Sequence, residues 1–207
     1  MSRFKTLAAL ILPPLWNNRV LPALDLPLRG RTAANLVFAT GYTKAFQGTP
    51  NWLSASGFRW GSASAAIVLT GYAIALSIPP LRRIPLEIET RTPETSTLEW
   101  TALHIPLGTV LAEEAIFRGT LDPLLTRSLG TPALSPLDFG LWHIHPARTA
   151  NDSIPATILA TTLAGLLFTE LRRRSNSATA PALLHLALNT GAALTPLAAR
   201  RIEQFRK

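Results

Sequence analysis

Long apolar stretches without formal charge dominate the hydrophobic pattern of this 207-residue chain. Residues 60–81 contain no Asp, Glu, Lys or Arg over 22 positions, residues 153–169 over 17 and residues 175–199 over 25. A helix of about 20 apolar residues spans a hydrocarbon core of roughly 30 Å, so each stretch predicts a membrane helix. The pattern therefore predicts an all-α, polytopic transmembrane helical bundle of about six or seven segments, with weaker candidates at about 6–16, 33–47, 98–117 and 133–147.

The composition favours the same class of protein. Hydrophobic residues make up 47% of the chain and charged residues only 15%, whereas charged residues make up about 25% of an ordinary soluble domain. The alternative is a very apolar soluble helical protein, which would have to hide three long uncharged stretches inside one small fold. We therefore expect a multi-pass protein of the cell membrane, with the lipid bilayer as its surroundings.

The net charge of +8 comes mainly from arginines that fall in small groups between the apolar stretches. Basic loops that flank membrane helices face anionic lipid headgroups. Nucleic acid is not an expected partner, because the chain has no finger or RNP motif and no basic stretch interleaved with aromatic residues. The positive-inside rule leaves the orientation open, since strict alternation of the spans puts Arg82-Arg83 and Arg172-Arg173-Arg174 on conflicting sides.

Two further segments, at the start and near the middle of the chain, carry weaker signals than the three long apolar stretches. Arg3 and Lys5 precede a short apolar stretch that Pro13-Pro14 interrupts, and no clear cleavage site follows, so we expect a first membrane or interfacial segment. Residues 85–99 are acidic and rich in Thr and Pro, which predicts an exposed loop before a helix. The chain has no cysteine, which excludes disulfides, thiolate catalysis and Cys-ligated zinc.

The first candidate cluster places Glu113, Glu114 and Arg118 in an otherwise apolar stretch. On a helix, Glu114 and Arg118 are four residues apart and share a face in the favourable order for an ion pair. Glu113 lies about 100° around the helix and is left without a cation of its own. Such a carboxylate at low dielectric can act as a base near neutral pH. The alternative is that all three form a solvated helix end closed by Gly119.

The second cluster is FGLWH, residues 139–143. Phe139 and His143 are four residues apart and share a helical face, whereas His145 falls on roughly the opposite side of a continuous helix. A single histidine on an apolar helix is more often a core residue than a catalyst. In a membrane helix the balance shifts toward function, because polar side chains there are costly.

The third cluster is HLALN, residues 185–189, where His185 and Asn189 lie one turn apart in the longest uncharged stretch. Both can donate hydrogen bonds, and the alternative is that they join helices through interhelical hydrogen bonds. Together with Glu113 and His143 they predict a polar cavity with one base, two imidazoles and one amide. Those groups can activate a water and stabilise a tetrahedral oxyanion. The chain has no GxSxG, GxGxxG or P-loop motif that would indicate other chemistry.

The three motifs EEAIFR (113–118), FGLWH (139–143) and HLALN (185–189) resemble, in this order, those of the CPBP family. These are the CAAX proteases and bacteriocin-processing proteins, also called Abi proteins or type II CAAX prenyl endopeptidase-like proteins. The resemblance covers about residues 98–195. It implies a catalytic core at 98–195. The chain has no repeat and no linker that would divide it, so we expect one structural domain with N-terminal membrane segments and loops at 1–97 and a basic tail at 196–207.

The resemblance implies an intramembrane glutamate-dependent endopeptidase. Glu113 and His143 would then activate the attacking water, and His185 and Asn189 would stabilise the oxyanion. Glu114, Arg118 and Phe139 match supporting positions. The implied substrate is a protein or peptide that is lipidated in part of the family.

Three alternatives stay open at this stage. Two histidines and one glutamate could in principle hold zinc, but the HExxH arrangement is absent and we favour a metal-free mechanism without a cofactor. The polar cavity could also belong to a non-catalytic membrane protein of the immunity or binding type. A proton or ion pathway through the intramembrane Glu and His residues is the third alternative.

Overall fold

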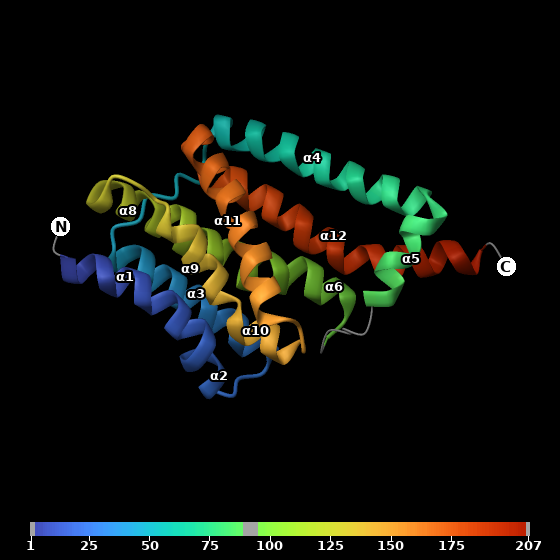
Figure 1. Ribbon diagram of the computed structural model, residues 1–207, viewed down its shortest axis with the longest axis horizontal. Coiled ribbons are helices and arrows are strands. Elements are labelled where there is room, and N and C mark those ends of the chain that lie inside the picture. Colours follow the sequence, from blue (N-terminus) through green and yellow to red (C-terminus); the bar gives the residue numbers. More distant parts are fainter. Residues whose placement is uncertain (1–2, 89–94, 206–207) are drawn as a thin grey trace.

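The computed structural model describes residues 3–88 and 95–205, and every regular element within these ranges is a helix (Figure 1). This confirms the all-α class. Labels α mark α-helices and labels η mark wider π-helical segments. The elements are α1 (Arg3–Leu15), η1 (Trp16–Val20), α2 (Leu21–Ala23), α3 (Leu28–Ala45), α4 (Ala55–Ser77), α5 (Pro79–Ile88), α6 (Thr97–Glu99), η2 (Trp100–Leu111), α7 (Ala112–Ile116), η3 (Phe117–Leu121), α8 (Asp122–Leu129), α9 (Leu134–Trp142), α10 (Ile144–Thr149), α11 (Ile154–Ser175) and α12 (Thr179–Gln204).

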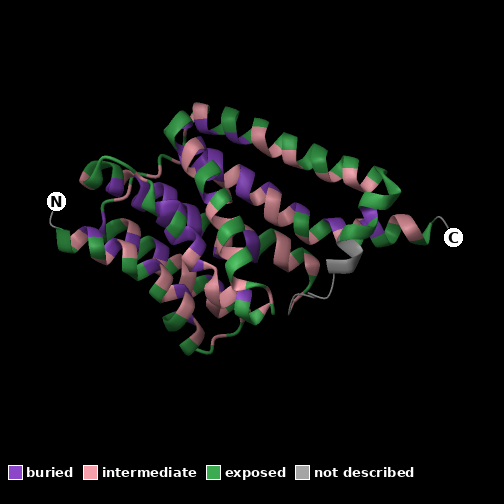
Figure 2. Ribbon diagram, in the orientation of Figure 1, coloured by how far each residue is buried: buried purple, intermediate pink, exposed green. Residues whose placement is uncertain are grey.

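Three helices, α4, α11 and α12, are long and apolar enough to cross a membrane. They correspond to the three uncharged stretches of the sequence. Only 6% of the most apolar part of α4 is buried inside the protein, and 17% of that of α11. Large apolar side chains such as Ile67 and Leu163 are exposed on them. The ribbon of α4 is coloured mostly exposed or intermediate (Figure 2). Lipid tails are the natural solvent for such faces, because exposing this much apolar surface to water is unfavourable.

Helices α4 and α12 run parallel and pack side by side (Figure 1). At their starts, a Cβ on Gly61 would lie 3.0 Å from Cα of Ala180. Near their ends, Arg82 at the start of α5 donates to Glu203 of α12 over 2.7 Å. The absence of a side chain at Gly61 therefore allows the two backbones to approach closely, as small residues do in membrane helix pairs.

We expect the substitution Gly61→Leu to destabilise the protein by about 1–3 kcal/mol, because an added Cβ would also come within 2.8 Å of Leu183. Gly71→Leu is the matched control on the same helix, since no atom lies within 4 Å of the Cβ position at Gly71. Thermal unfolding in detergent micelles, followed by tryptophan fluorescence, measures the difference. Equal melting temperatures for the two variants would contradict close packing at Gly61.

The segments α6, η2, α7, η3 and α8 join end to end into one helical rod from Thr97 to Leu129. It does not stop at Gly119, as the alternative interpretation of the first cluster required. It ends before Gly130, whose φ of +73° is the left-handed conformation that favours glycine at a helix end. Within η2, Pro106 lacks a backbone N–H, which accounts for one departure from regular α-helical hydrogen bonding. The two wide segments flank α7, where both glutamates of the first motif lie.

The expected loop at 85–99 is only partly correct. Helix α5 continues to Ile88, and the rod begins at Thr97, capped by the Ser96 hydroxyl, which accepts from the Glu99 amide. Residues 89–94 lie outside the described residues. Pro79-Pro80 opens α5, because proline fits the first helical turn, where its missing N–H has no intrahelical partner in any case.

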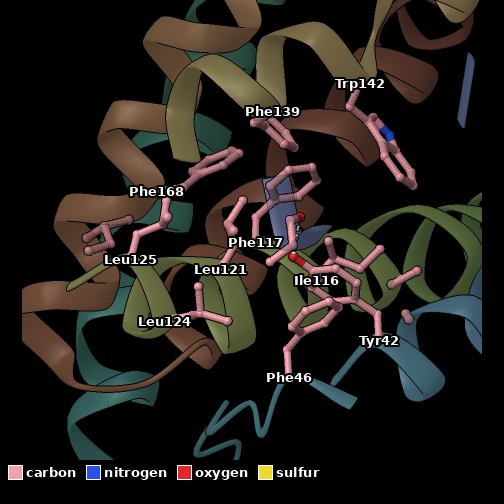
Figure 3. Packing of buried hydrophobic residues seen from close by; sticks show 14 of the residues in the cluster. Tyr42, Phe46, Ile116, Phe117, Leu121, Leu124, Leu125, Phe139, Trp142 and Phe168 are labelled. Atoms are coloured by element: carbon pink, nitrogen blue, oxygen red, sulfur yellow. Dashed lines mark hydrogen bonds between the residues drawn. The ribbon is translucent and has the colours of Figure 1, made fainter. Parts of the chain in front are cut away.

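The apolar core surrounds the middle of the rod, where α3, α9 and α11 meet it (Figure 3). Ile116, Phe117 and Leu121 on the rod are fully buried. Phe139 of α9 and Phe168 of α11 close over them from the other side (Figure 3). This packing fixes the part of the rod that carries the charged residues of the first motif.

Candidate active site

The three charged residues of the first motif are buried. Glu113 is 5% exposed, and Glu114 and Arg118 are fully inaccessible. This overturns the alternative of a solvated helix end. Buried charges are retained only where they are paired or functional, since desolvation costs several kcal/mol per ion. The cluster therefore needs a partner for each charge.

The predicted ion pair between Glu114 and Arg118 is present. Nη1 of Arg118 lies 3.5 Å from Oε1 of Glu114, one helical turn away. Three aromatic rings surround the guanidinium at 5.6 Å (Phe117), 4.3 Å (Phe139) and 5.0 Å (Phe168). Its Nη2 also donates to the Gly165 carbonyl at 3.2 Å. Arg118 is thus held by cation–π contacts as much as by its carboxylate.

Glu113 points away from Arg118, as the helical spacing predicts, but it has another partner. Nε1 of Trp142 donates to Oε1 of Glu113 over 3.1 Å. The other carboxylate oxygen, Oε2, lies 3.9 Å from Nε2 of His185. The hydrogen bond from Trp142 was missed by the sequence interpretation, although Trp142 immediately precedes the motif histidine. It fixes the orientation of the carboxylate while leaving Oε2 for other chemistry.

His185 joins the two glutamates. Its Nδ1 donates to Oε1 of Glu114 over 2.8 Å, while its Nε2 faces Glu113. The ring stacks on Phe168 with centroids 4.9 Å apart. A neutral ring with its proton on Nδ1 accepts at Nε2, so His185 can donate there only as an imidazolium.

His143 lies at the junction between α9 and α10. Its Nδ1 donates to the Phe139 carbonyl over 2.7 Å, which leaves Nε2 of the neutral ring as an acceptor. The Phe139 ring packs edge-on against the imidazole at 4.8 Å and also contacts Arg118, in keeping with a supporting position. His143 interacts electrostatically with Glu113 and with His185.

A cavity of about 790 Å³ lies between the rod, α3 and the α9–α10 junction, and Glu113, Trp142 and His143 line it. His145 lines the same cavity, which corrects the expectation that it falls on the opposite side. The reason is that α9 ends at Trp142 and α10 begins at Ile144, so helical spacing does not apply across His143.

His185 lies behind this lining, in contact with Glu114. Asn189 lies one turn further along α12 and is half-buried. Within the described ranges, Asn189 makes no side-chain hydrogen bond and does not line the cavity. The structure therefore brings Glu113, His143 and His185 together and leaves Asn189 at the edge of the group.

A further histidine, His104, lines the cavity on the side of α3 and was not singled out from the sequence. Its Nδ1 lies 2.7 Å from the Thr32 hydroxyl and its Nε2 3.2 Å from Oε1 of Glu99. Glu99 also accepts two hydrogen bonds from Arg29, at 2.7 and 3.2 Å. His104 carried no signal beyond its place in an apolar stretch.

The donor set does not fit a zinc ion. Among residues 3–84 and 95–205, no three His, Asp or Glu side chains are grouped at a spacing that could hold a metal. His143 and Glu113 each have a free acceptor atom, but Nδ1 of His185 is bound to Glu114. A zinc site with three protein ligands would require His185 to give up its hydrogen bond to Glu114, or Asn189 to bind the zinc, which asparagine rarely does.

Comparison with known protein families gives a match. The family model described as type II CAAX prenyl endopeptidase Rce1-like matches residues 95–191. This segment includes all seven residues of the three motifs that the sequence interpretation placed in the site, from the rod to α12. No curated protein and no solved structure matches the chain.

Proposed function

Because the chain belongs, through residues 95–191, to the Rce1-like family of type II CAAX prenyl endopeptidases, we propose that it is an intramembrane endopeptidase in which glutamate and histidine activate the attacking water. The observation that supports this most is the buried network of Glu113, Glu114, Arg118 and His185 beside a cavity that His143 lines. Burying a network of this kind in an apolar protein costs free energy, so its presence indicates a function.

In the proposed reaction, a water in the cavity attacks the carbonyl carbon of the scissile peptide bond. Glu113 accepts a proton from this water, and Nε2 of His143 accepts a hydrogen bond from the same water. Trp142 keeps the Glu113 carboxylate oriented, because its indole donates to the carboxylate oxygen Oε1. The proton then passes to the leaving amine as the tetrahedral intermediate collapses, so that one carboxylic acid and one amine are released.

The oxyanion of the intermediate needs hydrogen-bond donors. As the family resemblance implies, we assign this task to His185 and Asn189. The bond from Nδ1 of His185 to Glu114 supports the assignment, because it fixes the ring with Nε2 on the side of Glu113. Arg118 in turn neutralises Glu114. Asn189 would have to approach the cavity when substrate binds.

We also propose that the protein is a multi-pass protein of the cell membrane. Helices α4, α11 and α12 would cross the bilayer, joined by α1, α3, the rod and α9 to give about seven segments. The cavity between α3, the rod and the α9–α10 junction would then be polar and lie at membrane depth. A peptide segment, free or lipidated, is the proposed substrate.

The direct test is cleavage by the purified full chain in liposomes. Matched peptides with and without an isoprenoid or acyl chain would be incubated with it and the products identified by mass spectrometry. Hydrolysis at a defined bond supports the proposal. If no peptide is cut under conditions in which the protein is folded, the non-catalytic alternative of a binding or immunity protein is favoured instead.

We expect this activity to survive removal of metal ions. The described donor groups form no three-ligand site, so catalysis should not depend on zinc. Rates measured before and after exhaustive chelation and dialysis should agree within about twofold. Loss of activity on chelation that is restored by added zinc would show that the metal-dependent alternative is correct.

A further inference from the structure

A buried carboxylate next to the proposed site, Asp122, has no role in the reaction described above. It begins α8, one turn along the rod from Arg118, and is 4% exposed. Within the part of the chain that the structure describes, neither of its carboxylate oxygens has a hydrogen-bond partner at ordinary length. An isolated charge in such a place is strongly disfavoured, so neighbouring groups must compensate it.

Two hydroxyl groups and two guanidinium groups provide that compensation. The Ser135 and Thr169 hydroxyls, from α9 and α11, face Asp122 and themselves lack other hydrogen bonds within the described residues. Asp122 is attracted by Arg118 and by Arg172, and it is repelled by Glu114. Because two guanidinium groups already face this carboxylate, the place is unsuited to a bound cation.

The position of Arg118 depends on more than its pair with Glu114. Its Nη1 approaches that carboxylate only to 3.5 Å, and neither its Nε nor its Nη1 has a hydrogen bond of ordinary geometry within the described ranges. Aromatic rings attract a guanidinium without fixing its direction closely. A second carboxylate on the same side of the rod supplies an opposing attraction. Arg172 contacts the same turn, since its Nε donates to the Arg118 carbonyl over 3.0 Å.

We propose that Asp122 is a positioning residue for the proposed peptidase reaction. Its carboxylate, supported by Ser135 and Thr169, holds the Arg118 guanidinium in place between itself and Glu114. Glu114 in turn holds Nδ1 of His185, whose Nε2 lies beside Glu113. Asp122, Arg118 and Glu114 thereby form a row of alternating charges along the rod, and this row sets the orientation of the His185 imidazole. This inference rests on the proposed function for its effect on catalysis, but the effect on His185 itself is independent of it.

The activity test compares Asp122→Asn with Asp138→Asn. Asp138 is a matched control, because it is also a buried carboxylate, 5% exposed, but it lies on α9 at an apolar groove and interacts with Tyr42. We expect Asp122→Asn to lower kcat by about tenfold or more with little change in KM, and Asp138→Asn to stay within about twofold of the original chain. Equal effects of the two substitutions would overturn the proposal.

The independent test uses the small number of histidines. The chain has four, so protein labelled only at histidine gives a simple set of imidazole NMR signals, and loss of one signal in His185→Gln identifies His185. We expect Asp122→Asn to shift the His185 signal and Asp138→Asn to leave it in place. Ser135→Ala, which keeps the charge, should shift it less and in the same direction, and it decides the matter if Asp122→Asn does not fold.

An unmoved His185 signal in both Asp122→Asn and Ser135→Ala would overturn the positioning role whether or not the protein cleaves peptides. A shifted signal in a protein that cleaves nothing would support the positioning role and refute the peptidase function. The two proposals can therefore fail separately.

Discussion

Substitution of Glu113 by glutamine is expected to abolish peptide cleavage while the protein remains folded. Glutamine has the same shape, and its amide oxygen can still accept the hydrogen bond that Trp142 donates to Glu113. It cannot accept a proton from water, so the general-base step is lost. Removal of a general base typically costs a factor of about 10²–10⁴ in rate. The measurement is kcat for peptide hydrolysis by purified protein in liposomes.

Two controls separate loss of chemistry from loss of structure. Asp138→Asn removes a buried carboxylate of similar exposure that lies outside the cavity containing Glu113. The melting temperature of Glu113→Gln should stay close to that of the original chain, because the hydrogen bond from Trp142 is kept. Full activity in Glu113→Gln would remove Glu113 from its role as base. A loss of activity equal to that of Asp138→Asn would indicate a structural effect only.

The features that depend on short-range spacing could be predicted from the sequence. Glu114 and Arg118 are one turn apart, and helical geometry alone places them in contact. The same argument directs Glu113 away from Arg118. The long uncharged stretches likewise became α4, α11 and α12, since length and apolar character determine such helices with little help from the rest of the fold.

Contacts between distant helices could not be predicted in this way. Trp142 and Glu113 are 29 positions apart, and His185 and Glu114 are 71 apart, so their hydrogen bonds depend on how α9 and α12 pack against the rod. The side on which His145 lies depends on where α9 ends, because the break at His143 interrupts the helical spacing between His143 and His145. His104 binds Thr32 across 72 positions, and no local pattern indicates that contact.

Replacement of Arg118 by methionine should destabilise the protein more than any other single change considered. Methionine fills a similar volume among Phe117, Phe139 and Phe168, so the packing loss is small. The substitution leaves Glu114 fully buried, with His185 as its remaining hydrogen-bond partner among the described residues. Removing one partner of a buried ion pair costs about 3–5 kcal/mol, because the remaining charge is stranded at low dielectric.

Denaturant unfolding in detergent micelles measures this loss, and Arg173→Met is the control. Arg173 is also paired with a glutamate, Glu170, over 2.7 Å, but its side chain is 68% exposed. Solvent screens that pair, so its removal should change stability by no more than about 1 kcal/mol. The double substitution of Arg118→Met with Glu114→Leu should recover part of the lost stability, because it removes the stranded charge as well. If the double variant is no more stable than Arg118→Met, the cation–π contacts with the three phenylalanines, and not the ion pair, hold this part of the rod in place.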